Sequence, residues 1–353
     1  MKNIIEQDLQ TIIDGVGYPI MQFEGKEILI TGACGFLGSW YIAIFQYLNQ
    51  HKFKRACKVY AVDSFIAADK LNSIVEVTDS NIQFKRIDIN EMTFDSDDKV
   101  DFIIHAAGIA SPIYYRKFPI ETIEGMVMGL HKLLNFAARN SVKSFLFFSS
   151  SEMYGNPTPE NVPTKETYYG NVNAIGPRSC YDESKRIGET MCMVWEKIHG
   201  VPVKWVRPFN VYGPGMRVSD DRVIPKFTFQ LLKGENITVH TPGEQTRTFC
   251  YITDAMIGFL KAMLIGKNGE AYNIGNSTPE LTIKGLAEIM QEKFQSKSRI
   301  IEIEMPKEYP RDQAQRRCPD LSKAREHLSY LPTVELNKGL TRTYHWCKEA
   351  LNG

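Results

Sequence analysis

A tyrosine and a lysine that could act together as a base lie four residues apart in the segment RSCYDESKRIGE. On a helix, this spacing places the side chains of Tyr181 and Lys185 on one face. An ammonium group beside a phenol favours the phenolate and lowers the pKa of the phenol. The pair could then remove a proton from a hydroxyl group. Many exposed helices carry the same spacing, so the elements around the pair must support this interpretation.

A cluster of hydroxyl and carboxyl groups follows an apolar run that ends near residue 150. The sequence there reads SFLFFSSSEMYG, and Ser149, Ser150, Ser151 and Glu152 come where the run ends. In parallel sheets the ends of the strands face the crevice that binds ligands. We therefore expect these side chains to lie near Tyr181.

A glycine-rich turn follows the first apolar run. Gly32, Gly35 and Gly38 form a GxxGxxG pattern, with Phe36 and Leu37 opening the next helix. Glycines at these positions let the backbone approach a pyrophosphate, which is held by the free amides at the start of the helix. The turn indicates a dinucleotide site.

Five further positions specify the dinucleotide. Asp63 ends the second apolar run, where a carboxylate accepts from both ribose hydroxyls and repels a 2′-phosphate. This favours NAD over NADP, and the positive nicotinamide would further lower the pKa of Tyr181. Asp88 and Ile89 are expected to edge the adenine pocket. Ala106 and Ala107 are small enough to let the dinucleotide cross the sheet edge.

Short apolar runs alternate with helical patterns along the first two thirds of the chain. Residues 120–139 and 182–199 have the period of helices. An order of strand, helix, strand predicts a parallel sheet covered on both faces, an α/β doubly wound fold. The six runs that we interpret as strands are 27–32, 58–63, 82–88, 101–107, 144–150 and 203–208.

The chain divides into three parts. Residues 1–22 are expected to form an amphipathic extension, docked on the body of the protein or on a partner subunit. Residues 23–210 form the predicted NAD-binding domain, to which the segment 244–277 returns. After Pro208 the pattern loosens, and 211–243 together with 278–353 are predicted to form a smaller cap that completes a cleft.

Composition excludes several classes of protein. The 353 residues carry 42 Lys+Arg against 41 Asp+Glu, which gives no electrostatic case for nucleic acid or membrane partners. No apolar run is long enough to span a bilayer, and acidic residues interrupt the N-terminal segment, so it is not a secretion signal. Seven scattered cysteines without a CxxC pair predict reduced thiols in a cytoplasmic protein. The histidines show no ligand spacing, so no metal is expected.

These motifs together resemble the extended short-chain dehydrogenases/reductases, the branch that modifies nucleotide sugars. Within it, the sequence is most similar to the UDP-glucuronate decarboxylases (UDP-xylose synthases), and the similarity extends over about residues 25–350. The resemblance implies a Rossmann fold with a smaller C-terminal nucleotide-sugar-binding cap. It rests on the segments SSSEMYGNP (149–157), YGNVNAIGPRSCYDESKRIGE (169–189), GEQTRTFCYITDA (243–255) and RRCPDLSKA (316–324).

The resemblance also implies the catalytic residues. They are Ser150 in place of the usual threonine, Glu152, Tyr181, Lys185, and Arg247 in EQTRTF, whose guanidinium would hold a carboxylate. In the implied mechanism Tyr181 removes the proton of the sugar 4-hydroxyl while NAD takes the hydride. Carbon dioxide leaves from the 4-keto sugar, the carbanion that remains is protonated, and the hydride then returns, so NAD is recycled.

The substrate site carried over from the family consists mainly of basic and polar side chains. Asn210 and Arg317 are expected near the pyrophosphate, together with Arg222. Arg178, beside Tyr181, is expected either to face the sugar or to stabilise its loop. His240 would flank the base, at a position where the family usually has tyrosine.

Two departures from the family pattern bear on the chemistry. An asparagine is usual in the helix after the fourth strand, where this chain has Met126, and Ala174 replaces a proline in the loop before Tyr181. We therefore keep three alternatives: a nucleotide-sugar 4,6-dehydratase, a 4-epimerase, and a nucleotide-sugar-binding protein without turnover. Ser151 stands where one group of dehydratases has aspartate, which argues against that group.

The family resemblance also implies a partner. The helices at 120–139 and 182–199 form a four-helix bundle between two subunits in this superfamily. We therefore expect a homodimer.

Overall fold

The computed structural model of the 353-residue protein describes most of the chain. The described residues are 2–66, 72–75, 79–95, 99–217, 220–241, 243–304 and 314–352.

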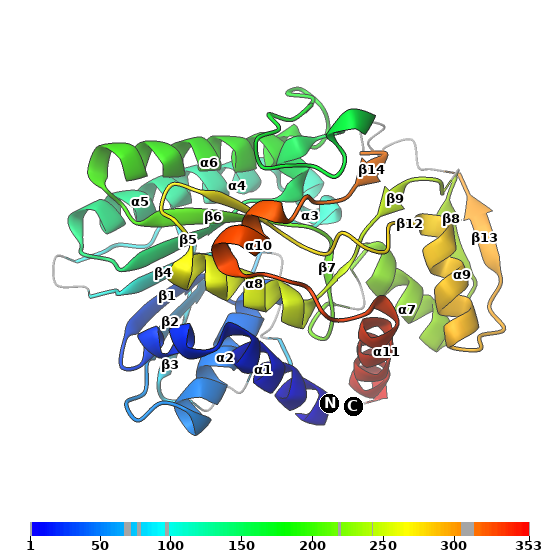
Figure 1. Cartoon of the computed structure of the whole chain (residues 1–353), viewed down its shortest axis with the longest axis horizontal. Coiled ribbons are helices and arrows are strands. Elements are labelled where there is room, and N and C mark those ends of the chain that lie inside the picture. Colours follow the sequence, from blue (N-terminus) through cyan, green and yellow to red (C-terminus); the bar gives the residue numbers. More distant parts are fainter. Residues whose placement is uncertain are drawn as a thin grey trace.

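A seven-stranded sheet forms the centre of the molecule (Figure 1), in the order β11-β6-β5-β4-β1-β2-β3, and every neighbouring pair of strands is parallel. This confirms the predicted parallel sheet. All six predicted strands are present, and a seventh from the segment 244–277 extends the sheet. The strands are β1 (Glu27–Thr31), β2 (Lys58–Asp63), β3 (Ile82–Arg86), β4 (Phe102–His105), β5 (Ser144–Phe148), β6 (Val203–Pro208) and β11 (Ala271–Ile274).

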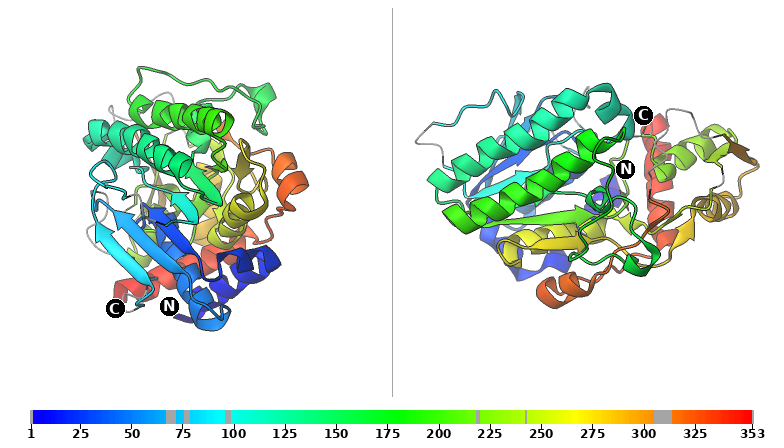
Figure 2. Two further views of the ribbon diagram at one scale, coloured as in Figure 1. Left: turned by 90° about the vertical axis from the view of Figure 1, so that its left-hand side faces the viewer. Right: turned by 90° about the horizontal axis from the view of Figure 1, so that it is seen from above.

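Helices cover both faces of the sheet, because strands β4 and β5 are buried along their whole length and need apolar cover on each side. The long helices α5 (Gly129–Arg139) and α6 (Ser179–His199) lie side by side on one face (Figure 2). Helices α2 (Phe36–His51) and α8 (Ile252–Ile265) pack on the other. The fold is therefore a doubly wound α/β sheet.

The helix predicted over residues 120–139 is interrupted. It consists of α4 (Pro119–Ile123), a π-helical turn η2 (Glu124–Met128) centred on Met126, and α5. Short π-helical turns are frequent at functional sites. A short helix, α3 (Pro112–Lys117), precedes them and follows the end of β4.

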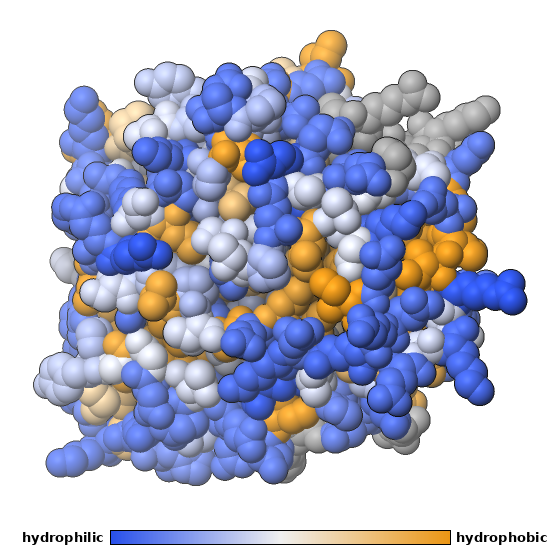
Figure 3. Space-filling model, turned by 45° about the vertical axis from the view of Figure 1, so that its right-hand side comes forward, coloured by the Kyte–Doolittle hydropathy of each residue, from blue (hydrophilic) through white to orange (hydrophobic). Residues whose placement is uncertain are grey.

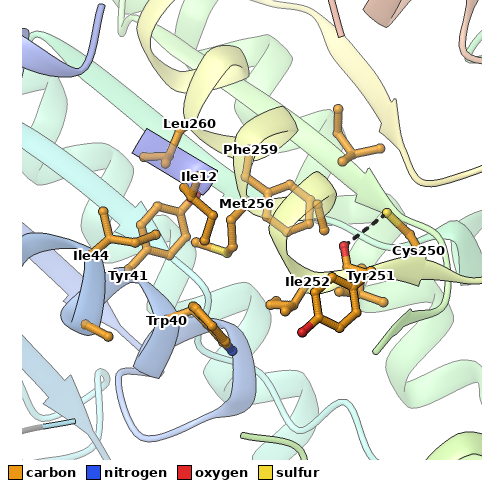
Figure 4. Packing of buried hydrophobic residues seen from close by; sticks show 14 of the residues in the cluster. Ile12, Trp40, Tyr41, Ile44, Cys250, Tyr251, Ile252, Met256, Phe259 and Leu260 are labelled. Atoms are coloured by element: carbon orange, nitrogen blue, oxygen red, sulfur yellow. Dashed lines mark hydrogen bonds between the residues drawn. The ribbon is translucent and has the colours of Figure 1, made fainter. Parts of the chain in front are cut away.

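The N-terminal segment packs on the body of its own subunit, which is one of the two positions expected from the sequence. Helix α1 (Lys2–Val16) packs on α8 and α2, and the 3-10 helix η1 (Tyr18–Phe23) follows it. Figure 4 shows Ile12 of α1 beside Tyr41 of α2 and Leu260 of α8. A Cβ at Gly15 would lie only 2.4 Å from Cδ1 of Ile257, so the glycine allows this close approach.

Most of the smaller elements of the C-terminal half lie at one end of the sheet (Figure 1), whereas α10 packs on α8 and β11. Three small sheets join β10 to β7, β12 to β9 and β14, and β13 to β8. Apolar side chains interrupt the polar surface in a band on the face that Figure 3 shows. The elements are β7 (Val211–Tyr212), α7 (Val223–Lys233), β8 (Ile237–His240), β9 (Thr246–Arg247), β10 (Cys250–Tyr251), β12 (Leu281–Thr282), α9 (Ile283–Lys293), β13 (Ile300–Ile303), β14 (Arg316–Arg317), α10 (Ser322–Leu328) and α11 (Leu336–Asn352).

The two ends of the chain lie close together (Figure 1). Arg342 of α11 donates to the carbonyl of Ile4 at 2.9 Å and pairs with Asp8 at 2.8 Å. Asp8 also accepts a hydrogen bond of 2.6 Å from the Tyr251 hydroxyl. Of the helices in the described ranges, none is both long enough and apolar enough to cross a membrane.

Candidate active site

A cleft of about 370 Å³ opens at the carboxyl ends of the central strands. Every residue that the sequence predicted for the dinucleotide lines this cleft. Two of them belong to α6, and the others lie at or after the ends of the four strands β1 to β4. The full set consists of Gly32, Gly35, Phe36, Leu37, Gly38, Asp63, Asp88, Ile89, Ala106, Ala107, Tyr181 and Lys185.

The turn between β1 and α2 is built for close backbone approach. Gly32 has φ of 72°, a left-handed conformation, and a Cβ there would lie 2.6 Å from the carbonyl carbon of Ala106. A Cβ at Gly38 would lie 2.1 Å from the carbonyl oxygen of Gly32. Larger residues would therefore disrupt the turn. The amides at the start of α2, a 16-residue helix, face the cleft and suit a pyrophosphate.

Asp63 is fixed in the cleft by two backbone amides. Its Oδ2 accepts from the amide of Cys34 at 2.8 Å, and its Oδ1 accepts from the amide of Phe65 at 2.8 Å. The carboxylate therefore has a defined orientation at the end of β2. The glycine turn and this carboxylate fit the pyrophosphate and the ribose of an NAD molecule.

Tyr181, Ser150 and Lys185 come together on the other side of the cleft. The Tyr181 phenol and the Ser150 hydroxyl form a hydrogen bond. Nζ of Lys185 donates to the carbonyl of Phe148 at 2.6 Å and lies 5.7 Å from the centroid of the Tyr181 ring. These three side chains lie together because α6 begins near the carboxyl end of β5.

In the protein alone, the pKa of Tyr181 does not show the lowering predicted for the phenol beside Lys185 and the positive nicotinamide. Burial raises the pKa of Tyr181 to about 12, although the hydrogen bond from Ser150 acts in the opposite direction. Burial also lowers the pKa of Lys185 to about 7, against the attraction of Glu189. Both groups are buried, so desolvation outweighs the ammonium–phenol attraction that the spacing suggested.

Glu152 lies among basic side chains. It pairs with Arg178, and Arg317 binds it with both terminal nitrogens, with a distance of 2.7 Å from Nη2 to Oε2. Burial alone would raise the pKa of Glu152, but the charges of Arg178, Arg317 and Arg247 outweigh burial and lower this pKa to about 2. Glu152 is therefore an anion that accepts hydrogen bonds throughout the neutral pH range. We call Arg178, Arg247 and Arg317 the arginine cluster.

Only some of the other residues predicted to bind the substrate line the cleft. The described residues that line the cleft include Arg178, Asn210 and Arg222 but not Arg247, Arg317 or His240. Arg247, which is buried, donates from Nη1 to the carbonyls of Thr246 and Gln315. His240 ends β8.

Two of these residues lie against Glu152. Arg317, which was expected near a pyrophosphate, reaches Glu152 because β14 runs beside β9 and comes to the serine-rich strand end. Arg178, which was expected to face the sugar or to stabilise its loop, lines the cleft, and its guanidinium contacts Glu152 and Asp182. Arg222 pairs with Asp220 at the rim of the cleft.

Met126, the departure from the family pattern, is fully buried beside the reactive pair. It packs in one apolar cluster with Ile109, Tyr115 and Tyr181. A Cβ at Gly108 would lie 2.7 Å from Cε of Met126 and 3.4 Å from Nζ of Lys185. The thioether thus borders the lysine where the family usually has an amide.

Two residues of the site were missed by sequence reasoning. Tyr115 stacks on Tyr181 with ring centroids 5.3 Å apart and planes inclined by 18°. Asp182 is buried next to Tyr181, and its Oδ2 accepts from Nε of Arg178 at 3.3 Å. The sequence did contain a signal for Asp182, because this residue directly follows the tyrosine of the YxxxK motif. Tyr115 comes from a different element, and local sequence gave no such signal.

Comparison with known proteins places the chain among nucleotide-sugar enzymes. UDP-glucuronic acid decarboxylase 6 of Arabidopsis thaliana is 39% identical over 89% of this chain and 86% of its own length. UDP-glucuronic acid decarboxylase 1 of Xenopus tropicalis is 36% identical over 95% of this chain and 76% of its own. The solved structure of UDP-glucuronic acid 4-epimerase from Bacillus cereus, in complex with UDP-glucuronic acid and NAD, is 26% identical. It covers 92% of this chain and 99% of its own, with a TM-score of 0.76.

The NAD dependent epimerase/dehydratase family matches residues 28–275, which include the whole glycine turn, the serine-rich strand end and the Tyr181–Lys185 pair. The chain belongs to the NAD dependent epimerase/dehydratase family.

Proposed function

We propose that this protein is an NAD-dependent decarboxylase of UDP-glucuronate that works through a 4-keto sugar. The observation that carries the proposal is the arginine cluster around Glu152, beside Ser150 and Tyr181. Arg178 and Arg317 contact Glu152, and the charge of Arg247 also acts on it. Three guanidinium charges against the carboxylates of Glu152 and Asp182 leave one excess positive charge when both carboxylates are ionised. A substrate carboxylate would neutralise that charge. The sequence identity to UDP-glucuronic acid decarboxylases supports the same substrate.

The cofactor would be held by the glycine turn, by Asp63 and by the start of α2. Gly32 and Gly38 allow the backbone to approach its pyrophosphate, and Asp63 is oriented to accept from its ribose hydroxyls. NAD, when bound, supplies a positively charged ring that accepts a hydride from the sugar and returns it.

Residues of α6 and of the segment directly after β5 would carry out the proton transfers. Tyr181 would take the proton of the sugar 4-hydroxyl, and Ser150, hydrogen-bonded to the phenol, would orient that hydroxyl. Lys185, held by the carbonyl of Phe148, lies on the same helix face. Burial keeps the phenol protonated in the protein alone, so its action as a base requires the positive charge that bound NAD would supply. The hydroxyl then formed on Tyr181 would give the proton back at the end of the reaction.

The carboxylate steps fall to the arginine cluster. A ketone at sugar C4 is β to the carboxylate, so the electrons of the breaking C–C bond can delocalise into the ketone when carbon dioxide leaves. The family resemblance assigns the substrate carboxylate to Arg247, whose guanidinium would have to turn from the carbonyls of Thr246 and Gln315 toward the cleft to hold it. Arg178 and Arg317 keep Glu152 anionic and oriented toward the ring.

The ionisation of Glu152 bears on the dehydratase alternative. Elimination of water requires an acid for the departing hydroxyl group. With its pKa held at about 2, Glu152 carries no proton at neutral pH, and the two residues before it, Ser150 and Ser151, are hydroxyl groups of very weak acidity. Neither Glu152 nor these two serines would therefore supply the acid that elimination of water requires.

We propose further that the protein is a cytoplasmic homodimer. All seven cysteines are free thiols, which is the state expected in a reducing compartment. Large apolar side chains are exposed on the outer face of α4, η2 and α6, where a second copy would cover them. They are Ile120, Ile123, Met128, Ile187, Met193, Val194 and Ile198.

Incubation of the purified protein and NAD with UDP-glucuronate, UDP-galacturonate and UDP-glucose, followed by mass spectrometry, tests the proposed function. We expect loss of carbon dioxide from UDP-glucuronate and no change in UDP-glucose. Loss of water from any sugar would support the dehydratase, and an isomer of unchanged mass would support the epimerase.

A further inference from the structure

Asp182 occupies a position that the mechanism above does not use. It lies on the first turn of α6, directly after Tyr181, and its side chain is only 8% exposed. Its Oδ2 accepts from Nε of Arg178, while the terminal Nη2 of the same guanidinium meets Oε2 of Glu152. Arg178 thus bridges two carboxylates through different nitrogens. Because a guanidinium is planar and rigid, the contact at Nε fixes the direction of Nη2.

The second carboxylate oxygen of Asp182 is buried and has no hydrogen-bond partner among the described residues. Buried polar atoms are usually paired, so an unpaired oxygen beside reactive groups requires an explanation. The groups whose charges reach Asp182 are Arg178 on its own helix, Glu152 at the strand end and Arg317 on β14. Tyr115 of α3 also senses the charge of Asp182.

We propose that Asp182 is a positioning residue for the proposed decarboxylation: its ionised carboxylate holds Arg178 in the orientation that presents Glu152 to the sugar. This inference rests on the proposed function. Protonation of Asp182 would leave Arg178 without its second ionic partner and allow the guanidinium to rotate away from Glu152. The unpaired Oδ1 is where the proton would reside.

The ionisation of Asp182 falls in the pH range where the enzyme would work. Burial raises the pKa of Asp182, Arg178 opposes burial and Glu152 adds to it, with a pKa of about 7 as the result. Below this pH Asp182 is protonated, and above it Asp182 is ionised. If the ionised form positions Arg178, the turnover number must rise as the pH increases through about 7.

The test compares Asp182→Asn with Glu183→Gln, its neighbour on α6. Both variants replace one carboxylate with an amide, but Glu183 is 40% exposed and pairs only with Arg186 in the described contacts. We expect Asp182→Asn to lower kcat roughly tenfold or more at about pH 8, with a smaller effect on KM, because misplaced groups slow the chemical step. At about pH 6, where wild-type Asp182 is protonated, the two rates should converge. Glu183→Gln should follow the wild-type profile at both pH values.

Other outcomes separate the possible roles. A loss of kcat in Asp182→Asn that is equal at both pH values would overturn the proposal, because it would indicate a structural role. Wild-type kcat in Asp182→Asn at about pH 8 would overturn it as well. Asp182→Glu, which restores the charge, should recover part of the activity and the rise through neutral pH, and its failure to do so would count against the proposal. Absence of carbon dioxide release by the wild-type protein would instead contradict the proposed function.

Discussion

Burial determines the charge of the residues at the base of the cleft. Lys185, Tyr181 and Asp182 are all removed from water, and in each case desolvation is the largest influence on the pKa. Glu152 differs because three guanidinium groups overcome the cost of burying its charge. The site therefore combines one permanent anion with three groups whose protonation can change near neutral or alkaline pH. Such a combination suits a reaction that moves a proton off and onto a sugar.

Tyr181→Phe removes only the phenolic hydroxyl and keeps the stacking surface against Tyr115. We expect kcat to fall by roughly 10²–10⁴, the usual contribution of a general acid–base group. KM for UDP-glucuronate should change little, since the ring remains in place. Steady-state kinetics of carbon dioxide release measure both quantities, and Tyr115→Phe serves as the matched control for loss of a nearby hydroxyl. Undiminished kcat in Tyr181→Phe would show that this phenol is not the base.

Glu152→Gln leaves Arg178 and Arg317 without their shared anion. Since the folded-state pKa of Glu152 is depressed to about 2, its ion pairs stabilise the protein above the ordinary pKa of a glutamate and lose this effect as the pH falls toward 2. The variant should therefore be less stable by roughly 3 kcal/mol at neutral pH. Urea unfolding at about pH 7 measures the difference. Equal stability of variant and wild type would contradict the ion-pair account.

Sequence patterns located most of the reactive residues but not their contacts. The glycine turn, Asp63, Ser150, Glu152, Tyr181 and Lys185 all line the cleft, because strand ends and helix starts fix their positions locally. The stacking of Tyr115 on Tyr181 joins residues far apart in the sequence, and so does the pairing of Arg317 with Glu152. The first contact depends on how α3 lies against α6, and the second on how β14 reaches the end of β5. One sequence without related sequences contains no local signal for them.

At the scale of elements, helix α1 is the part least expected from the dinucleotide-binding pattern. The sequence predicted an amphipathic extension at residues 1–22, but it could not specify which surface covers the apolar side of that extension. The structure shows α8 and α2 as the cover, and Leu9, Ile12, Ile13 and Val16 are buried there. Periodicity reports which side of a helix is buried, whereas the identity of the neighbour follows only from the folded sheet.

Ile12→Ala tests the contribution of α1 to the fold. Ile12 is completely buried among side chains of α2 and α8, so its truncation should lower the free energy of unfolding by about 2–5 kcal/mol. Glu6→Ala on the exposed side of the same helix is the control and should have little effect. Chemical denaturation of both variants gives the comparison. A change below about 0.5 kcal/mol for Ile12→Ala would mean that α1 is not bound to the body in solution.

The parallel sheet was easier to predict from the sequence than the exact form of the helix at 120–139. Alternation of apolar runs and helical patterns is sufficient to predict a parallel sheet, and the structure confirms it. The π-helical turn around Met126 was not foreseen, because apolar spacing does not distinguish a π turn from a regular helix. That turn places the thioether against Tyr181 and near Lys185.

At the scale of the whole molecule, the exposed apolar stripe on α4, η2 and α6 requires cover. Ile187 and Val194 lie seven residues apart on α6, which places them on one face of the helix. Changing both to aspartate should convert a dimer to a monomer, because two buried charges on each side of the interface would oppose association. Light scattering at several concentrations measures the mass. Ile301→Asp, an exposed isoleucine on β13, is the control and should leave the mass unchanged, whereas a monomeric wild-type protein would refute the proposed dimer.

The central claim is that the protein removes the carboxyl group of its sugar substrate and restores its own cofactor. UDP-glucuronate labelled with ¹³C at the carboxyl carbon tests this most directly, with NAD absorbance followed in the same reaction. We predict labelled carbon dioxide in an amount equal to the nucleotide-sugar product, transient reduction of NAD, and neither signal in Tyr181→Phe. Retention of the label in the nucleotide sugar during turnover would contradict the account.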